Sequence, residues 1–350
     1  MLLWLALSIR QRGVSLKTID VYALGNALVD SEFIVEPEFL KESKIEKGVM
    51  TLIDESRVGE ITDLLKDPPQ KRVSGGSAAN TIVALSQLGG SGFYAFKVNN
   101  DEDGKFYVSD LKKNGVEFSD LSIVESKDAT GKCMVLVTPD ADRTMNTFLG
   151  ASAGFSKKEC EFDEIKNSHY LYSEGYLMTS PDATLAVKEA MKVAREAKVK
   201  TAFTLSDPGV VAGFKAQFLD VLSEPVDLLF CNESEAMSLT DTKDVNAACE
   251  ALKTFAHSFA ITTGKDGSVI FDGSEKIEIP GNAVKAIDTN GAGDMYAGAF
   301  MFALSQDKSF EEAGKLANFL SSKIVTVYGP RVKKEKMRTF INEFKDKIKK

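Results

Sequence analysis

Short apolar runs alternate with amphipathic stretches along most of the chain. The runs predicted as strands cover residues 19–29, 92–98, 170–177, 201–205, 226–231, 259–263 and 268–271. The stretches with the apolar spacing of helices cover residues 38–44, 55–66, 78–88, 104–114, 182–197, 214–222, 233–239 and 245–255. Two helices are predicted to close the chain. Strands that alternate with helices predict an α/β fold with a mostly parallel sheet covered on both faces.

Residues 31–53 and 130–148 do not follow this alternation. Residues 49–53 are extended between two helical stretches, and the second segment contains two extended runs around a turn at residues 139–142. Two such runs joined by a short polar turn predict a β-hairpin. We therefore expect the two segments to form a small β-structure that projects from the edge of the sheet as a lid.

The N-terminal 18 residues differ from the rest of the chain. Residues 1–7 are apolar and are followed by a polar stretch with two arginines, Arg10 and Arg12. The apolar run is too short to span a bilayer, and it lacks the basic start and the cleavage site of a secretory signal. We predict that residues 1–18 form a disordered extension, with organelle targeting left open, and that residues 19–350 form one domain.

Composition narrows the class of protein. Hydrophobic residues make up 43% and charged residues 27% of the chain, as in soluble globular proteins, and the net charge of −8 disfavours nucleic-acid or membrane-surface partners. The four cysteines are scattered without a Cys-x-x-Cys pair, which favours reduced thiols and a cytoplasmic location. The two histidines do not have the spacing of metal ligands, so a zinc site or a Ser-His-Asp triad is not expected.

The segment from Asp288 to Asp294 reads Asp-Thr-Asn-Gly-Ala-Gly-Asp and precedes an apolar helical stretch at residues 295–304. Glycines let the backbone approach a ligand, and the unpaired N–H groups and the dipole of a helix N-terminus attract anions. Asp294 beside such a site suits a base that removes a proton from a hydroxyl, which then attacks a phosphate held by the amides. The alternative is a glycine-rich turn with an aspartate cap.

Two further polar clusters lie where strands or loops meet helices. Gly75, Gly76 and Asn80 come directly before or within a helical stretch, where glycines permit close approach and an amide can bind hydroxyls. Asn26 and Asp30 lie at the end of the first predicted strand, and ligands of open α/β sheets bind outside the carboxyl ends of strands. An ordinary helix cap and a strand end would explain the same residues.

Asn232 and Glu235 follow the apolar run at residues 226–231. A carboxylate and an amide at a helix start can hold water around Mg²⁺, and the same two residues can form a capping box. The two roles are compatible. The stretch at residues 262–267 lies between two extended runs and suits either a hairpin turn or a turn that contacts phosphate.

Together these motifs resemble the signatures of the ribokinase-like family of carbohydrate and nucleoside kinases. The likeness covers residues 19–331: residues 288–294 resemble its C-terminal signature, Gly75-Gly76 followed by Asn80 its N-terminal signature, and residues 232–235 its Mg²⁺-linked motif. The resemblance implies a ribokinase-like fold, in which a mostly parallel central sheet is covered by helices on both faces and carries a small β lid. It also implies an ATP-dependent kinase.

Within that family, Gly25-Asn26 with Asp30, the 288–290 variant of the signature and residues 145–150 resemble the adenosine kinases. The resemblance implies transfer of the γ-phosphate of ATP to the 5′-hydroxyl of a nucleoside, adenosine first. A sugar kinase for ribose, fructose or a related sugar is the alternative. A non-catalytic nucleotide-binding regulator is disfavoured because a pure binder needs no base at Asp294.

The resemblance also assigns roles to single residues. The catalytic set is the base Asp294 and an anion hole formed by the amides of Gly291, Ala292 and Gly293. The substrate residues are Asn26, Asp30, Gly75, Gly76 and Asn80. The ATP residues are Asn232, Thr262, Gly264, Gly267 and Asn318. Mg²⁺ is expected to bind through water near Glu235.

Arg143, in the predicted hairpin, is expected to reach the transferring phosphate when the lid shuts. Tyr176, Phe148 and Phe33 are the candidates to stack on a nucleobase. Activation by a monovalent cation such as K⁺ and the choice between monomer and homodimer stay open. The expected partners are ATP and the small-molecule substrate.

Overall fold

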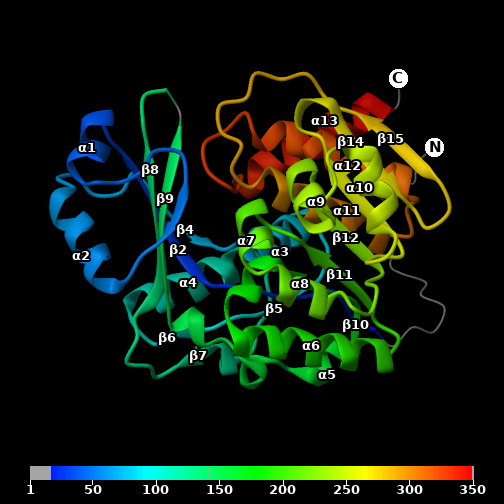
Figure 1. The fold of residues 1–350 in the computed structure, drawn as a ribbon, viewed down its shortest axis with the longest axis horizontal. Coiled ribbons are helices and arrows are strands. Elements are labelled where there is room, and N and C mark those ends of the chain that lie inside the picture. Colours follow the sequence, from blue (N-terminus) through cyan, green and yellow to red (C-terminus); the bar gives the residue numbers. More distant parts are fainter. Residues whose placement is uncertain (1–16, 141, 349–350) are drawn as a thin grey trace.

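The computed structural model describes residues 17–140 and 142–348, and the expectations for residues 1–16 lie outside these ranges. The larger of its sheets has eight strands in the order β15-β14-β13-β12-β11-β10-β1-β5 (Figure 1). Neighbours from β13 to β5 run parallel, and β14 and β15 are antiparallel. The strands are β1 (Ile19–Leu24), β5 (Gly92–Ala95), β10 (Ser168–Glu174), β11 (Lys200–Thr204), β12 (Leu228–Asn232), β13 (Phe259–Thr262), β14 (Gly267–Phe271) and β15 (Lys276–Pro280). The predicted α/β fold with a mostly parallel sheet is confirmed.

Helices cover both faces of this sheet. One face packs against α3 (Ser77–Leu88), α4 (Glu102–Lys113), α11 (Ala292–Ser305), α12 (Phe310–Ile324) and α13 (Lys334–Ile348). The other packs against α5 (Phe162–Lys166), α6 (Pro181–Glu196), α7 (Pro208–Gly213), α8 (Lys215–Val221), α9 (Glu233–Thr240) and α10 (Val245–Leu252). Strand β1 serves both faces, because successive side chains of a strand point in opposite directions. Val21 and Ala23 join one core, and Tyr22 and Leu24 join the other.

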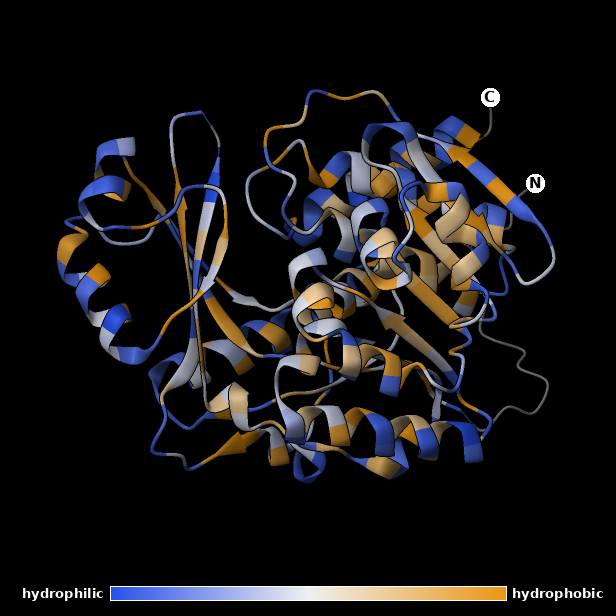
Figure 2. Cartoon of the chain, in the orientation of Figure 1, coloured by the Kyte–Doolittle hydropathy of each residue, from blue (hydrophilic) through white to orange (hydrophobic). Residues whose placement is uncertain are grey.

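Hydropathy follows this layering (Figure 2). Apolar residues run along the inner strands of the large sheet, whereas most helices carry alternating polar and apolar residues. This is the pattern expected for parallel strands buried on both faces and for helices with one exposed face. None of the helices in residues 17–140 and 142–348 combines the length and the apolarity needed to cross a membrane.

A second sheet of five strands stands beside the first, in the order β3-β9-β8-β2-β4. Its strands are β2 (Leu28–Ile34), β3 (Met50–Leu52), β4 (Lys71–Gly75), β8 (Thr130–Val137) and β9 (Arg143–Gly150). Helices α1 (Pro37–Glu42) and α2 (Glu55–Leu64) lie on its outer side (Figure 1). A small cluster of Val35, Leu40 and Leu136 packs there. The strands in the segments 31–53 and 130–148 therefore belong to a separate small sheet, as predicted.

The predicted strand at residues 19–29 was wrong in one respect, because it is two strands in two different sheets. The chain leaves β1 at Gly25 and enters β2 at Leu28. A Cβ at Gly25 would lie 2.6 Å from the Cβ of Ala78 and 2.7 Å from Oε2 of Glu174, so no larger residue fits at this crossing. Asp30 consequently lies inside β2, opposite Val73 and Cys133, and not at the end of the first strand.

Other boundaries also differ from the predictions. The predicted strand at residues 92–98 is β5 and the short β6 (Val98–Asn99), which pairs with β7 (Ile123–Val124). Within the described residues three helices, not two, follow β15. The sequence reading missed β4, β15, α5 and α7, which are short or alternate only weakly between apolar and polar residues.

Candidate active site

A pocket opens between the two sheets, at the carboxyl ends of the parallel strands. In open α/β sheets this is the edge where ligands bind. We call it the inter-sheet pocket. It is lined by Asn26, Leu28, Asp30, Met50, Leu52, Gly76, Ser77, Asn80, Cys133, Val135, Met145, Thr147, Glu174, Tyr176, Thr179, Ser206, Val210, Phe214, Asn232, Glu235 and residues 289–294.

A second pocket, the glycine pocket, continues from the N-terminus of α11 along β13 and β14. Its lining includes Thr262, Gly264, Gly267, Gly281, Gly293 and Asn318. A connecting cavity shares Asp294, Asn232 and Glu235 with the inter-sheet pocket and shares Thr262 and Gly264 with the glycine pocket. The side chains predicted for substrate and for ATP therefore line adjoining cavities that meet near Asp294.

Asp294 lies in the first turn of α11 and is held by two neutral donors from α3. The hydroxyl of Ser77 donates to Oδ1 at 2.6 Å, and the side-chain amide of Asn80 donates to Oδ2 at 2.9 Å. Burial raises the pKa of Asp294 to about 6, and the hydrogen bonds from Ser77 and Asn80 and the charge of Arg331 act in the opposite direction. A carboxylate whose pKa lies close to neutral suits a general base.

The turn before α11 brings backbone amides to the same place. Gly291 caps the helix with φ 76°, and a Cβ there would lie 2.5 Å from the carbonyl oxygen of Pro330. Residues 289–293 line the inter-sheet pocket beside Asp294. The N–H of Ala292 reaches the carbonyl of Thr289 at 3.3 Å, a long contact that leaves it able to turn to a better acceptor. The N-terminus of a helix of this length favours an anion at this position.

Asn80, predicted to bind substrate hydroxyls, also has partners within the protein. Its Nδ2 is used by Asp294, and its Oδ1 accepts a hydrogen bond from Nε of Arg331 at 2.7 Å. Asn80 lines the inter-sheet pocket, but both ends of its amide are engaged by protein groups. Gly76 lines the pocket as well, whereas Gly75 lies behind it, where its lack of a Cβ leaves room for the carboxylate of Asp30.

Asp30 and Glu174 place two more carboxylates in the pocket wall. Burial raises the pKa of Asp30 to about 7, with the charge of Arg331 as the largest opposing effect. Glu174 accepts hydrogen bonds from the backbone N–H of Asn26 at 2.8 Å and from that of Ala78 at 2.6 Å. Burial raises its pKa to about 7, and these two bonds oppose the shift. Glu174 thereby joins the crossing between the sheets to the start of α3.

The far wall of the inter-sheet pocket is apolar. The small sheet contributes Leu28, Met50, Leu52, Val135 and Met145. The segments that follow β10 and β11 of the large sheet contribute Tyr176, Val210 and Phe214. Of the three aromatic candidates, Tyr176 therefore lines the pocket. Phe33 packs on the opposite, α1 side of the small sheet, and Phe148 is not part of the lining.

Asn232 and Glu235 form the predicted capping box at the start of α9. The Asn232 side chain accepts from the Glu235 N–H at 2.8 Å, and Glu235 accepts from the Asn232 N–H at 3.0 Å and from Nδ2 at 2.7 Å. Burial raises the pKa of Glu235 to about 7. The carboxylate also lines the connecting cavity, so capping does not remove it from the site.

Four of the five predicted ATP residues, Thr262, Gly264, Gly267 and Asn318, line the glycine pocket, whereas Asn232 lines the inter-sheet pocket and the connecting cavity. Thr262 ends β13 and Gly267 begins β14, so the stretch between them is the turn of an antiparallel hairpin, with a short 3₁₀ helix at Gly264–Asp266. Asn318 on α12 donates from Nδ2 to the carbonyl of Ile279 at 3.0 Å. The hairpin turn is confirmed, and because it also lines a cavity, its contact with phosphate stays a prediction.

Arg143 lies apart from its predicted place. Its guanidinium forms an ion pair with Asp288, whose side chain is inaccessible to solvent, and a longer one with Glu32 at 3.4 Å. It borders a small neighbouring cavity with Asp30 and Lys71, and it is not part of the inter-sheet lining. The hairpin is thus connected by this ion pair to the loop that precedes α11.

Sequence reasoning missed three functional-site residues. Ser77 lies between Gly76 and Asn80 but was not assigned a role. Glu174 is the last residue of β10, and a carboxylate within a predicted strand of mostly buried residues is a signal that could have been used. Arg331 contacts Asn80 across 251 positions of sequence, and no local pattern predicts such a contact.

Comparisons with known proteins agree with this geometry. The sequence matches the family described as pfkB family carbohydrate kinase over residues 51–337. It is 27% identical over 342 residues to adenosine kinase of Saccharomyces cerevisiae, covering 91% of this chain and 98% of that protein.

Two solved structures also resemble the fold. The adenosine kinase from Sinorhizobium meliloti has a TM-score of 0.84 and 35% identity, with 90% of this chain and 96% of that chain covered. The probable sugar kinase protein from Rhizobium etli CFN 42 has a TM-score of 0.86 and 31% identity, with 95% and 99% covered.

Proposed function

Because the chain belongs to the pfkB family of carbohydrate kinases, we propose that it transfers the γ-phosphate of ATP to the 5′-hydroxyl of a nucleoside, adenosine first. The observation that carries the proposal is the position of Asp294, where the inter-sheet pocket meets the cavity that leads to the glycine pocket. A base at that junction lies between an acceptor on one side and a phosphate donor on the other.

The apolar wall of the inter-sheet pocket favours a nucleoside over a bare sugar. A sugar presents hydroxyls on nearly every face, whereas a nucleobase has two apolar faces that gain from contact with apolar side chains. Met50, Met145 and Phe214 offer such contact. The polar wall of Asn26 and Asp30 is suited to the ribose hydroxyls. The 35% identity to the adenosine kinase from Sinorhizobium meliloti supports the same choice.

The chemistry follows from the groups that line the junction. Asp294 accepts the proton of the 5′-hydroxyl, whose oxygen forms the new bond to the γ-phosphorus. The bond from that phosphorus to the bridging oxygen breaks, ADP leaves, and Asp294 later returns the proton to solvent. The amides of Gly291, Ala292 and Gly293 stabilise the charge on the transferring oxygens, because donors fixed in advance need no reorganisation during the reaction.

Mg²⁺ fits this arrangement through Glu235. Groups of three or more metal-binding side chains are absent from residues 17–140 and 142–348, so an all-protein cage is not part of the proposal. Mg²⁺ usually keeps several waters and needs one or two carboxylates beside the substrate phosphates. Glu235 is a hard oxygen donor in the connecting cavity, with Asn232 fixing its orientation. The ion supplies charge neutralisation at the phosphates. A role for K⁺ is left open.

The proposed ATP residues and cellular setting complete the assignment. Thr262, Gly264, Gly267 and Asn318 line the glycine pocket, which is open enough at its glycines for a nucleotide to lie against the backbone. The thiols of Cys133, Cys160, Cys231 and Cys249 are all buried and unpaired, which supports a reducing compartment such as the cytoplasm.

A sugar kinase is the second candidate. The 31% identity to the probable sugar kinase protein from Rhizobium etli CFN 42 favours it. The shared polar wall would serve a sugar equally well, and the apolar wall would then have no nucleobase to contact. The two candidates differ in whether a nucleobase contacts the apolar wall of the inter-sheet pocket.

A substrate panel separates the two candidates. Initial rates with adenosine, inosine, ribose and fructose at saturating MgATP are expected to show adenosine turned over with a kcat/KM at least about 100-fold above that of ribose. Phe214→Ala should raise the KM for adenosine about tenfold, because it removes an apolar contact. Leu185→Ala, on an exposed position of α6, is the matched control. Turnover of ribose or fructose without turnover of any nucleoside would overturn the proposal.

A further inference from the structure

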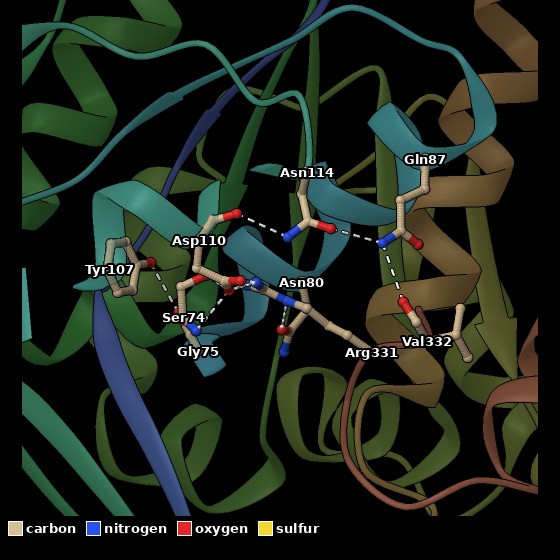
Figure 3. A network of polar contacts seen from close by, with 9 residues as sticks. All are labelled: Ser74, Gly75, Asn80, Gln87, Tyr107, Asp110, Asn114, Arg331 and Val332. Atoms are coloured by element: carbon tan, nitrogen blue, oxygen red, sulfur yellow. Dashed lines mark hydrogen bonds and ion pairs between the residues drawn. The ribbon is translucent and has the colours of Figure 1, made fainter. Parts of the chain in front are cut away.

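Arg331 is a buried arginine outside the pockets described above, with a side chain only 6% exposed. Figure 3 shows it between Asn80 on one side and Ser74 with Asp110 on the other. Its Nε donates to Oδ1 of Asn80 at 2.7 Å, and its Nη1 donates to Oγ of Ser74 at 2.6 Å and contacts Oδ2 of Asp110 at 3.3 Å. Burying a guanidinium is costly, so an arginine placed here calls for a reason beyond stability.

The chemistry of the guanidinium determines which way the Asn80 amide points. Arginine has only donors, so the atom of Asn80 that faces it must be the carbonyl oxygen. The other end of the amide, Nδ2, is then obliged to face Asp294, to which it donates at 2.9 Å. Without Arg331, only the hydrogen bond to Asp294 would fix the direction of the Asn80 amide, and the amide would be held at one end instead of two.

We propose that Arg331 is a positioning residue for the base, acting on Asp294 through the side-chain amide of Asn80. The proposal rests on the proposed function, in which Asp294 accepts the proton of the substrate hydroxyl. Arg331 touches neither pocket, and its effect on the reaction passes through one intervening side chain. Two properties of Asp294 depend on it: the direction of its carboxylate and the pH at which it ionises.

The charges around Asp294 make the second property sensitive to Arg331. Burial raises the pKa of Asp294 to about 6, and the hydrogen bonds from Ser77 and Asn80 and then the positive charge of Arg331 oppose this shift. Other ionisable groups face the same space from the elements packed around it: Asp30 on β2, Tyr172 and Glu174 on β10, Tyr176 after it, and Glu235 on α9. Burial raises the pKa of every one of them, which favours their neutral forms. Loss of Arg331 would therefore remove the cation that favours the ionised form of Asp294.

Arg331 also has a structural role that the test must separate from positioning. Its contacts with Ser74 and Asp110 tie the turn before α13 to β4 and α4. Gln87 supports the same turn by donating to the carbonyl of Val332 at 3.2 Å (Figure 3). A variant that merely loosens this turn would lower stability and activity together. Positioning predicts a change in the pH profile.

The first experiment compares full-length Arg331→Met and Arg331→Lys with the wild type. Arg331→Met should lower kcat about tenfold or more at neutral pH, with the KM for ATP unchanged, because a misdirected base slows the chemical step. The acidic limb of its kcat profile should move up by about one pH unit. Arg331→Lys retains a cation with donors only, so its limb should stay near the wild-type position. Arg195→Met, a surface arginine paired with Glu224, is the matched control and should behave as wild type.

A second experiment tests the path through Asn80. In an Asn80→Ala background, Arg331→Met should cause no further loss of the kcat plateau above the acidic limb, because the link that directs the carboxylate is already broken. The limb itself should still move to higher pH, because the charge of Arg331 acts on Asp294 through space. Asp110→Asn loosens the same turn but removes a negative charge, so its acidic limb should not move to higher pH.

Three outcomes would overturn the proposal: an unshifted limb in Arg331→Met, additive losses in the double variant, or an upward shift in Asp110→Asn. Each of them requires an active wild type. An inactive wild type with every nucleoside would instead contradict the proposed function.

Discussion

The two aspartates that bound the 288–294 segment have opposite surroundings. Asp288, before the turn, has a fully buried side chain that pairs with the guanidinium of Arg143 and accepts the N–H groups of Asn290, at 3.0 Å, and Gly329. Asp294, after the turn, opens on two cavities and has neutral partners, both from α3. One aspartate of the segment thus pairs with a charged guanidinium, and the other is bound by a neutral hydroxyl and a neutral amide.

This difference teaches what each carboxylate can do. A carboxylate paired with a guanidinium has its oxygens occupied by a charged donor, so they are not free to take the proton of a substrate hydroxyl. A partly buried carboxylate with only neutral donors is easier to protonate, which is what a base requires. We infer that Asp288 joins the small sheet to the turn, and that Asp294 performs the chemistry. The following variants test that division.

Asp294→Asn should have the largest effect. Removing the base is expected to lower kcat by roughly 10²–10⁴-fold, because general-base catalysis contributes that much. The melting temperature should not fall, since the variant removes a buried charge while keeping the shape of the side chain. Steady-state kinetics and thermal denaturation of the same preparation measure both. Near-normal turnover would remove Asp294 from the proposed role.

Asp288→Asn should act on stability before it acts on chemistry. The change leaves the guanidinium of Arg143, which is 12% exposed, with only its longer ion pair to Glu32, which is expected to lower the free energy of unfolding by about 2 kcal/mol. Adding Arg143→Met should recover part of this loss, because the charge that has lost its main partner is then removed as well. Urea denaturation of the two single variants and the double variant gives the coupling. A stable Asp288→Asn protein with a lost kcat would mean that the roles of the two aspartates are reversed.

The pH dependence of activity should report Asp294 and not Asp288. The pKa of Asp294 is raised to about 6, and the base must be ionised to accept a proton. Activity should therefore fall as pH decreases through this value, by about tenfold for each further pH unit. The limb should persist in Asp288→Asn and be absent from the residual activity of Asp294→Asn. If the acidic limb vanished in Asp288→Asn, the titration would belong to Asp288 and the prediction for Asp294 would be wrong.

Stability should change with pH in the opposite sense to activity. Burial raises the pKa of Asp294 to about 6 and those of Asp30 and Glu174 to about 7, so the folded chain holds these protons more tightly than the unfolded chain does. The stabilisation is present below the unfolded pKa values and is lost as pH rises through the folded ones. The free energy of unfolding should therefore fall by about 1 kcal/mol or more between about pH 5 and about pH 7, and by less in Asp294→Asn. Urea titrations across this range would show it; rising stability would contradict it.

Much of the fold was readable from periodicity, and the failures have local causes. The strands from β10 to β13 are buried, apolar and separated by amphipathic helices, so their pattern predicts them directly. The break between β1 and β2 was missed because only three small residues, Gly25, Asn26 and Ala27, separate the two apolar runs. The reason for the break is the contact of Gly25 with Ala78 and Glu174, which come from elsewhere in the chain.

As with the fold, the parts of the site that depend on neighbouring residues were predicted, and the parts that depend on distant residues were not. Motifs within one turn, such as residues 291–294 and 232–235, can be recognised from neighbouring residues alone, and they line the pockets as expected. Contacts with residues from distant segments could not be predicted. Those of Asn80 with Arg331 and Asp294 are made only in the folded chain, so the sequence suggested for Asn80 only a contact with the substrate. The ion pair of Arg143 with Asp288 was missed in the same way.

The long sequence distances across the site have a consequence for biosynthesis. Ser77 meets Asp294 across 217 positions, and Asn80 meets Arg331 across 251. Contacts that close such large loops carry a high entropic cost and tend to form late in folding. A ribosome-bound chain would thus have its strands and helices in place well before it had a working base. The gain of phosphoryl transfer during refolding should lag behind the recovery of helical circular dichroism, which makes activity itself a measure of when the two ends of the chain have met.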